Sequence, residues 1–106
     1  MLDLKALLSK ILIRLYYVDA GTARLSASVA SGAYSDVAVS FHKTFETAPN
    51  VVVGFQSTST GATFGRCSCA AHSITTTGFK IRMFNGDTTA RQPSFYWVAM
   101  PAGGGI

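Results

Sequence analysis

The loop formed by residues 85–93 carries the side chains of this sequence that are best suited to bind a ligand. Its polar members include Asn85, Asp87, Arg91 and Gln92. Amide, carboxylate and guanidinium groups can donate and accept hydrogen bonds with the polar groups of a ligand, and an arginine can donate two parallel bonds at once. We therefore expect Asn85, Asp87 and Arg91 to contribute to a polar recognition patch. The alternative is a solvated loop in which Asn85, Gly86 and Asp87 only shape a turn.

Catalytic and metal-binding patterns are missing from the sequence. It has no nucleophile elbow, no glycine-rich phosphate loop and no pair of carboxylates, and its five acidic residues are scattered. Cys67, Cys69 and His72 lie close together, but strand alternation points the two cysteines to one face and the histidine to the other. Two cysteines at i and i+2 of one strand also have poor geometry for a disulfide. We expect free cysteines, no metal, no cofactor and no enzymatic activity.

Composition limits the molecule to one small domain. The chain has 106 residues and only 13% charged residues, about half of the usual share. Few charges indicate that part of the surface is covered in an oligomer. The formal charge of +4 is spread along the chain without a basic run among aromatics, so we expect no nucleic-acid partner. No apolar run reaches the ~20 residues of a membrane span.

The first 18 residues predict an amphipathic helix. Apolar residues recur at spacings of three and four, at Met1, Leu4, Leu8, Ile11, Leu15 and Val18. This heptad seam, with Leu at a and Ile at d, favours three- or four-stranded coiled coils. We expect residues 1–19 to be an oligomerisation helix, ended by Gly21. Alternatives are a helix lying on its own domain or on a membrane surface. Lys5, Lys10 and Arg14 interrupt the apolar run, so we expect no signal peptide.

From residue 22 the apolar period changes from 3.5 to 2, which is typical of strands. Six short strands are predicted at Arg24–Ala30, Asp36–Phe41, Val51–Gln56, Arg66–Ile74, Phe79–Phe84 and Ser94–Met100. Turn residues separate them, and no second helix is predicted. The expected fold is all-β, a six-stranded antiparallel β-sandwich over residues 22–100. Residues 101–106 are rich in glycine, and we expect a flexible tail there.

The last two strands carry large side chains on both faces. Phe79, Ile81 and Met83 alternate inward, which leaves Phe84 outward; Phe95, Trp97 and Ala99 likewise leave Tyr96, Val98 and Met100 outward. Such a second apolar face predicts burial by another subunit. The predicted interface residues are Leu4, Leu8, Ile11, Leu15, Val18, His72, Phe84, Tyr96 and Val98.

The order of several short motifs resembles the H-type lectin domain over roughly residues 24–100. These are Phe41, the run Ala48-Pro49-Asn50-Val51-Val52-Val53-Gly54-Phe55, Arg66, Thr77-Gly78-Phe79 and Phe95-Tyr96-Trp97-Val98-Ala99. Within that family, the chain looks most like versions at the ends of bacteriophage structural proteins. The resemblance implies a sandwich that assembles as a homotrimer, in some members as a dimer of trimers. It also implies that Arg66 is a sugar-binding residue.

The function implied by this resemblance is recognition of a receptor by a phage tail or head fibre. The ligand would be a glycan or a bacterial cell-surface polysaccharide, and the location would be the virion surface. The 85–93 loop lacks the aromatic and histidine residues of the family's sugar site, so the resemblance does not extend to N-acetylgalactosamine specificity. The alternative is a purely structural trimerisation or decoration module without a ligand.

Overall fold

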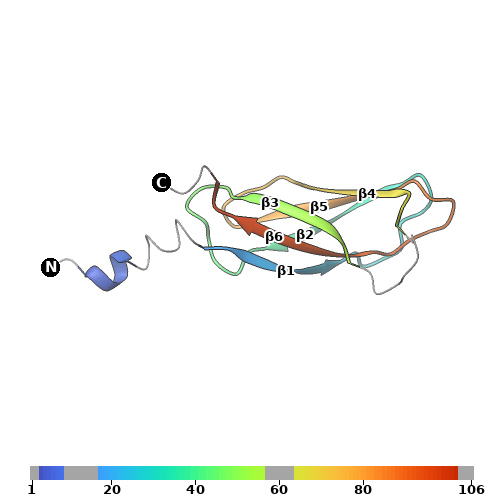
Figure 1. Ribbon diagram of the computed structural model, residues 1–106. Helices are drawn as coiled ribbons and strands as arrows, with labels where there is room; N and C mark the ends of the chain where they lie inside the picture. Colours follow the sequence, from blue (N-terminus) through green and yellow to red (C-terminus); the bar gives the residue numbers. More distant parts are fainter. Residues whose placement is uncertain (1–2, 9–16, 57–63, 103–106) are drawn as a thin grey trace.

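Two antiparallel sheets of three strands form the body of the protein (Figure 1). The computed structural model describes residues 3–8, 17–56 and 64–102. One sheet has the order β1 (Asp19–Arg24), β6 (Ser94–Met100), β3 (Asn50–Gln56); the other has the order β2 (Tyr34–Ser40), β5 (Gly78–Asn85), β4 (Cys67–His72). The predicted all-β, six-stranded sandwich is therefore confirmed, and the last strand has the predicted bounds.

The core lies between β5 and β6, the central strands of the two sheets. Its inward side chains are Phe79, Ile81 and Met83 from β5 and Phe95, Trp97 and Ala99 from β6, and all are buried. Because strand residues alternate between faces, the two sets meet across the sandwich. Burying each large apolar side chain stabilises the fold by about 1.5–3 kcal/mol. The predicted inward and outward alternation of both strands is confirmed.

Gly21 leaves the space that the Trp97 side chain occupies. The two residues are paired in the register of β1 and β6. A Cβ atom at position 21 would lie 2.9 Å from the indole ring, which is closer than atoms pack. The glycine therefore belongs to a strand and lets the ring lie flat beneath it.

The first strand was predicted in the wrong place. β1 is Asp19–Arg24, whereas the predicted strand ran from Arg24 to Ala30. Most of that stretch is instead the connection from β1 to β2, in which Leu25 and Val29 are buried and Ala27 is exposed. Leu25 and Val29, four residues apart, pack into the core without forming a strand. The residues of β1 itself are small and gave only a weak strand signal.

The predicted N-terminal helix does not extend as far as Val18. Residues 4–8 are helical, and the Asp3 carboxylate accepts hydrogen bonds from the backbone N–H groups of Lys5 and Ala6 at 3.1 and 3.2 Å, which is N-capping. Tyr17 and Val18 are not helical, and Asp19 already begins β1. The prediction of a helix to Val18, ended at Gly21, is therefore wrong at that end. Ile11 and Leu15 lie outside the described residues.

Contacts with the loop after β2 explain why residues 17–19 are extended. The Tyr17 ring packs on Phe45 with centroids 4.6 Å apart, and its hydroxyl accepts a hydrogen bond from the Lys43 N–H at 2.9 Å. The buried Asp19 carboxylate accepts one from the His42 N–H at 2.7 Å and contacts the His42 imidazole at 2.6 Å. A heptad pattern carries no information about these long-range partners.

Cys67 and Cys69 are free thiols that face the core from β4. Burial raises the pKa of the Cys69 thiol. Among the described residues, no three His, Cys, Asp or Glu side chains come together as a metal site would require. In the same residues, no helix is long and apolar enough to cross a membrane.

Candidate ligand-binding loops

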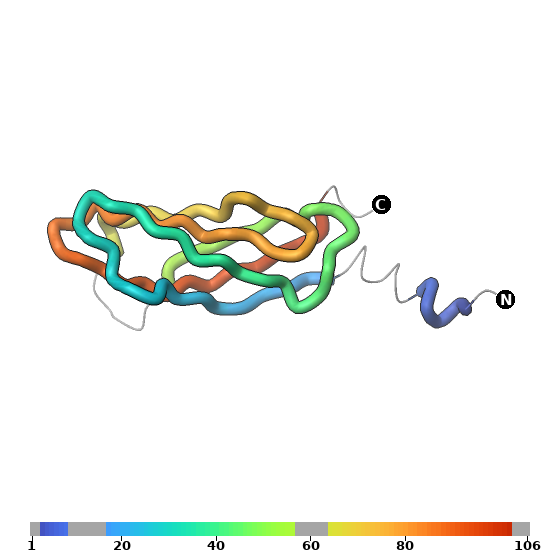
Figure 2. Tube along the Cα trace, turned by 180° about the vertical axis from the view of Figure 1, so that it is seen from behind, coloured from blue at the N-terminus to red at the C-terminus, as the bar shows by residue number. Residues whose placement is uncertain are grey.

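Three connections meet at one end of the sandwich and form a single unit (Figure 2). The backbones of Val29 and Arg91 pair in both directions, with N–H to O distances of 2.7 and 3.0 Å. The Asn85 carbonyl accepts a bond from the Gly32 N–H at 2.7 Å, and the Arg66 carbonyl accepts one from the Gly86 N–H at 3.1 Å. The β1–β2 connection, the residues before β4 and the β5–β6 loop are therefore held together by backbone hydrogen bonds.

Asn85 is the centre of this unit. It is fully buried. Its Nδ2 donates to the carbonyls of Val29 and Thr89 at 2.8 and 3.0 Å, and its Oδ1 accepts from the Asp87 N–H at 2.9 Å. The Cys67 thiol also donates to Oδ1 at 3.5 Å. Asn85 therefore shapes the loop, and the direct ligand contact that the sequence suggested is not open to this side chain.

Asp87 and Arg91 form an ion pair on the surface of the β5–β6 loop. Nε and Nη2 of Arg91 donate to the same Asp87 oxygen, Oδ2, at 3.0 and 2.8 Å, and Oδ1 accepts from the Thr88 N–H at 2.7 Å. The hydrogen bond from Arg91, supported by the one from Thr88, lowers the pKa of Asp87. Both side chains keep part of their surface exposed, so each can still reach a ligand.

Arg66 supplies a second cation at the same end. It is exposed, and its side chain has no hydrogen bond or ion pair with any residue that the structure describes. Its carbonyl oxygen accepts the hydrogen bond from the Gly86 N–H, and a Cβ atom at position 86 would collide with that oxygen. Only glycine fits at position 86, and this close approach brings Arg66 beside the loop that holds Asp87 and Arg91.

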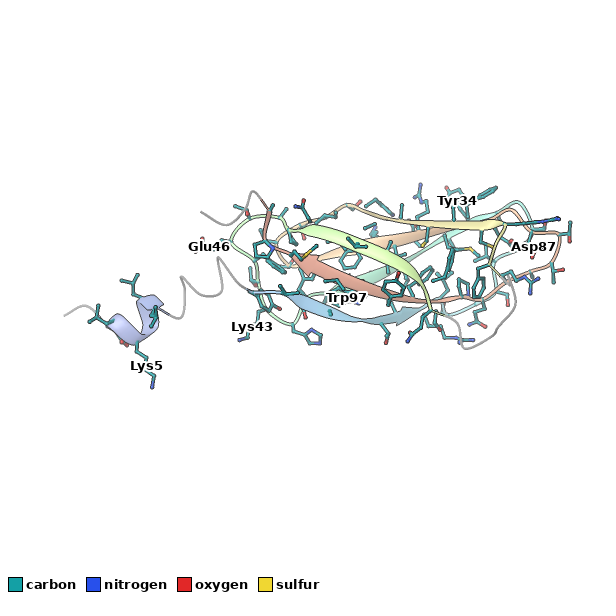
Figure 3. All side chains as sticks on the ribbon, in the orientation of Figure 1. Lys5, Tyr34, Lys43, Glu46, Asp87 and Trp97 are labelled. Carbon is teal, nitrogen blue, oxygen red and sulfur yellow. The ribbon has the colours of Figure 1, made fainter. Side chains whose placement is uncertain are left out.

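Two further loop residues were not predicted to have these roles. Gln92 donates through Nε2 to the Leu25 carbonyl at 2.8 Å, and the Ser31 hydroxyl donates to the Asp87 carbonyl at 2.5 Å. Each bond links segments more than fifty residues apart. No local spacing in the sequence could have revealed them. Figure 3 shows Asp87 at this end of the sandwich and Trp97 inside it.

A second polar network crosses the outer face of the β2–β5–β4 sheet. Asp36 accepts two hydrogen bonds from Arg82, from Nε at 2.9 Å and from Nη2 at 3.1 Å, and lies 3.3 Å from His72 Nε2. The Arg82 guanidinium also lies 4.5 Å from the centre of the Tyr34 ring. The hydrogen bond from Arg82 lowers the pKa of Asp36 and raises that of Arg82.

The predicted interface residues of the sandwich fall on its two opposite outer faces. Tyr96 and Val98 lie on the β1–β6–β3 sheet, whereas Phe84 and His72 lie on the β2–β5–β4 sheet. Phe84 and Tyr96 are each 46% exposed, and Leu4, Leu8 and Val18 are more than half exposed. These residues are thus available to a partner.

Solved structures with a similar fold come from bacterial and phage fibres. An N-truncated R1-type pyocin tail fibre has 20% identity and a TM-score of 0.61, over 77% of this chain and 67% of the fibre chain. The tailspike protein gp49 from Pseudomonas phage LKA1 has 22% identity and a TM-score of 0.61, over 78% of this chain and 14% of the tailspike. A C-terminal part of the P. aeruginosa R1 pyocin fibre has 19% identity and a TM-score of 0.60, over 77% of this chain and 22% of that one. At these identities the likeness is one of fold.

Sequence comparison gives the family. No curated protein matches the chain. The model of the H-type lectin domain matches residues 36–100, which is more than half of the chain and includes most of β2 and all of β3 to β6. The chain belongs to the H-type lectin domain family.

Proposed function

We propose that this protein is a non-enzymatic carbohydrate-recognition module of a phage fibre, exposed on the virion, and that it acts as a homotrimer. The ligand is a glycan or a bacterial cell-surface polysaccharide. The lectin family supports the ligand class, and the tail fibres and the tailspike of similar fold support the setting.

The observation that carries this proposal is the arrangement of Arg66, Asp87 and Arg91. Buried Asn85 and backbone pairing fix the loops, so the partly exposed Asp87 and Arg91 are held in place before a ligand arrives. The Asp87–Arg91 pair offers an acceptor next to a donor, and the Arg66 guanidinium forms no hydrogen bond with the described residues. Hydroxyl pairs on adjacent carbons of a sugar fit such donor and acceptor pairs.

The trimer is supported by the outer face of the β1–β6–β3 sheet. Val52, Tyr96 and Met100 are 52%, 46% and 40% exposed there, and Arg24 is the charged residue among the outward positions of these three strands. An apolar, nearly uncharged sheet face is typical of a surface covered by another subunit. We propose that the N-terminal segment adds to the association through the exposed side chains of Leu4 and Leu8. Three weak sites on one trimer would gain avidity through effective concentration.

Glycan-array binding tests this function. Arg66→Ala should abolish most of the signal, and the control is Lys43→Ala, which removes one positive charge at the opposite end of the sandwich (Figure 3). Equal loss in both variants would mean that binding depends only on net charge.

The second candidate is a structural trimerisation or decoration module. The apolar β1–β6–β3 face favours it, since that face would form a trimer whether or not the loops bind anything. A stable trimer that binds no glycan and no cell-wall polymer would favour this candidate over the lectin.

A further inference from the structure

The outer face of the β2–β5–β4 sheet contains a hollow of about 410 Å³ between β4 and β5. Its lining residues are Ser68, Cys69, Ala70, His72, Arg82 and Phe84. The volume falls within the roughly 300–1,000 Å³ of small-molecule sites. In the strand register, Ser68 lies opposite Phe84 and Ala70 lies opposite Arg82. Small residues of β4 therefore form the floor, and two large side chains of β5 rise beside them.

The hollow exists because Arg82 is directed away from β4. Its guanidinium is held on the β2 side by two hydrogen bonds to Asp36, at 2.9 and 3.1 Å, and by the Tyr34 ring at 4.5 Å. Ala70 is too short to fill the space that this leaves. His72, 3.3 Å from the same carboxylate, closes one end. The hollow is thus built by an ion-pair network that spans three strands.

Its chemistry suits one sugar ring. Phe84 is 46% exposed and offers an aromatic face to the C–H patch of a sugar. Arg82 uses Nε and one Nη2 hydrogen on Asp36, which leaves three of its five N–H donors open. The Ser68 hydroxyl on the floor has no hydrogen bond with the described residues and can donate or accept.

A second copy of the chain is the competing occupant, and closure of the oligomer argues against it. The hollow and the apolar β1–β6–β3 face lie on opposite outer faces of the sandwich. Two patches that point in opposite directions join subunits into an open row, whereas a closed trimer needs patches at an acute angle. The face with the hollow also carries the charged residues Asp36, Lys80 and Arg82. Apart from Arg24, the outward positions of the apolar face offer no charges that would complement them.

We propose that this hollow is a second saccharide subsite, which takes one sugar ring against Phe84 with Arg82 and Ser68 as its hydrogen-bonding groups. The hollow adjoins the loop site, because Ser68 is two residues from Arg66 and the Phe84 ring lies beside Gly86, but its lining residues belong to β4 and β5 and not to the loops. It depends on the proposed function only for the ligand class. Asp36 is a positioning residue, because it holds Arg82 at the rim. Phe84 and His72, predicted from the sequence to be interface residues, are ligand-facing residues in this proposal.

NMR titration of the full, ¹⁵N-labelled chain tests the subsite. The probes are the methyl glycosides of N-acetylglucosamine, galactose, mannose and rhamnose, each raised to high millimolar concentration. At least one should shift the amide signals of Ser68, Ala70 and Phe84 along a saturating curve. Phe84→Leu keeps apolar bulk without the aromatic face and should weaken this binding at least about tenfold. Ala70→Leu fills the hollow without removing any group and should abolish binding while the rest of the spectrum is unchanged.

Several results would overturn the subsite. The first is that none of the four glycosides shifts these amides. The second is that Phe84→Leu and Ala70→Leu leave the affinity unchanged. The third is that Phe84→Ala converts the oligomer to monomers. The last result would assign Phe84 to a subunit contact. Arg66→Ala separates the two proposals: it should remove shifts at Asp87 and Thr88 and leave those at Ala70. If only the shifts in the loops are lost, the proposal for the hollow is unaffected. If only the shifts in the hollow are lost, the proposal for the loop site is unaffected.

Discussion

Asn85 shows how one buried amide can hold several surface loops in place. Its Nδ2 and Oδ1 bond to the backbones of Val29, Thr89 and Asp87. Groups of this kind are costly to leave unpaired once they are buried. The order of the surface loops therefore depends on a residue beneath them.

Asn85→Ala should lower the free energy of unfolding by about 2–4 kcal/mol, because it removes the partner of the Thr89 carbonyl and of the Asp87 N–H, takes one of two bonds from the Val29 carbonyl, and opens a cavity. Urea unfolding measures the loss. Asn50→Ala, at an exposed position in β3, is the matched control and should change stability by less than about 0.5 kcal/mol. Similar values for the two variants would contradict the role given to Asn85.

Asp19 is the other buried polar residue with several partners. Burial alone raises the pKa of its carboxyl group, but hydrogen bonds from the His42 backbone and imidazole, from Tyr17 and from Ala20 outweigh burial, and the pKa lies below the ordinary 3.8. A carboxylate with a depressed pKa stabilises the fold above its unfolded-state pKa. That contribution is lost as the pH falls through the folded-state value.

Asp19→Asn should therefore reduce stability at about pH 7 by roughly 1–3 kcal/mol and reduce the difference between about pH 7 and about pH 3. Urea titrations at the two pH values give both quantities. Asp36→Asn removes a carboxylate whose pKa is also lowered, but one on the outer face, and should cost no more than about 1 kcal/mol. A pH profile of Asp19→Asn that parallels that of the unaltered chain would show that the Asp19 carboxylate is not one of the titrating groups.

At the scale of the element, β1 is a strand because its small residues fit under the Trp97 ring. Ala20, Gly21, Thr22 and Ala23 give a weak strand signal, since glycine and alanine are uncommon in strands. They form one because β6 offers a register in which Gly21 lies opposite Trp97. The partner strand, seventy residues away, decides the conformation of this segment.

Gly21→Ala should destabilise the protein by about 1–3 kcal/mol, because the new methyl group meets the indole at 2.9 Å. Trp97 is the sole tryptophan of the chain, so its fluorescence reports the displacement directly. We expect emission at longer wavelength and a lower Tm. Thr22→Ala, which changes the outward neighbour, should leave the emission unchanged. An unshifted spectrum in Gly21→Ala would mean that the strand moves and the ring does not.

The same contrast explains how far the sequence predicts this structure. Strands β2 to β6 carry alternating apolar residues, and that local pattern located them within one or two residues of their observed ends. β1 and the extended Tyr17 and Val18 depend on partners that are distant in sequence, and their predictions were wrong. At the loop end, composition alone indicated Asp87 and Arg91, but the burial of Asn85 depends on contacts with Val29 and Cys67, which the sequence does not display.

The whole molecule has one outer face with charged side chains and one that is nearly free of them. Asp36, Lys80 and Arg82 lie on the β2–β5–β4 face, and Val52, Tyr96, Val98 and Met100 lie on the other. If the apolar face is the subunit contact, a charge there should disrupt the trimer, and a charge on the opposite face should not.

Val52→Glu should convert the trimer to monomers, because an unpaired carboxylate would be buried at the contact. Light scattering coupled to size-exclusion chromatography measures the mass. Ala38→Glu, at an exposed position of β2, is the control and should remain trimeric. A trimer in both variants would place the contact elsewhere, and monomers already in the unaltered chain would end the trimer proposal.

The start of β1 and the end of β6 are neighbours, since Asp19 pairs with Ala99 in the register of the two strands. The candidate loops lie at the other end of those strands, where Arg24 pairs with Ser94. The start of β1 and the end of β6 are therefore remote from the candidate loops, as Figure 1 shows. A biosensor that anchors the protein through a tag at either terminus would present the loops to the analyte in one uniform orientation. The same layout would let another protein be fused to the domain at either end without altering the candidate loops.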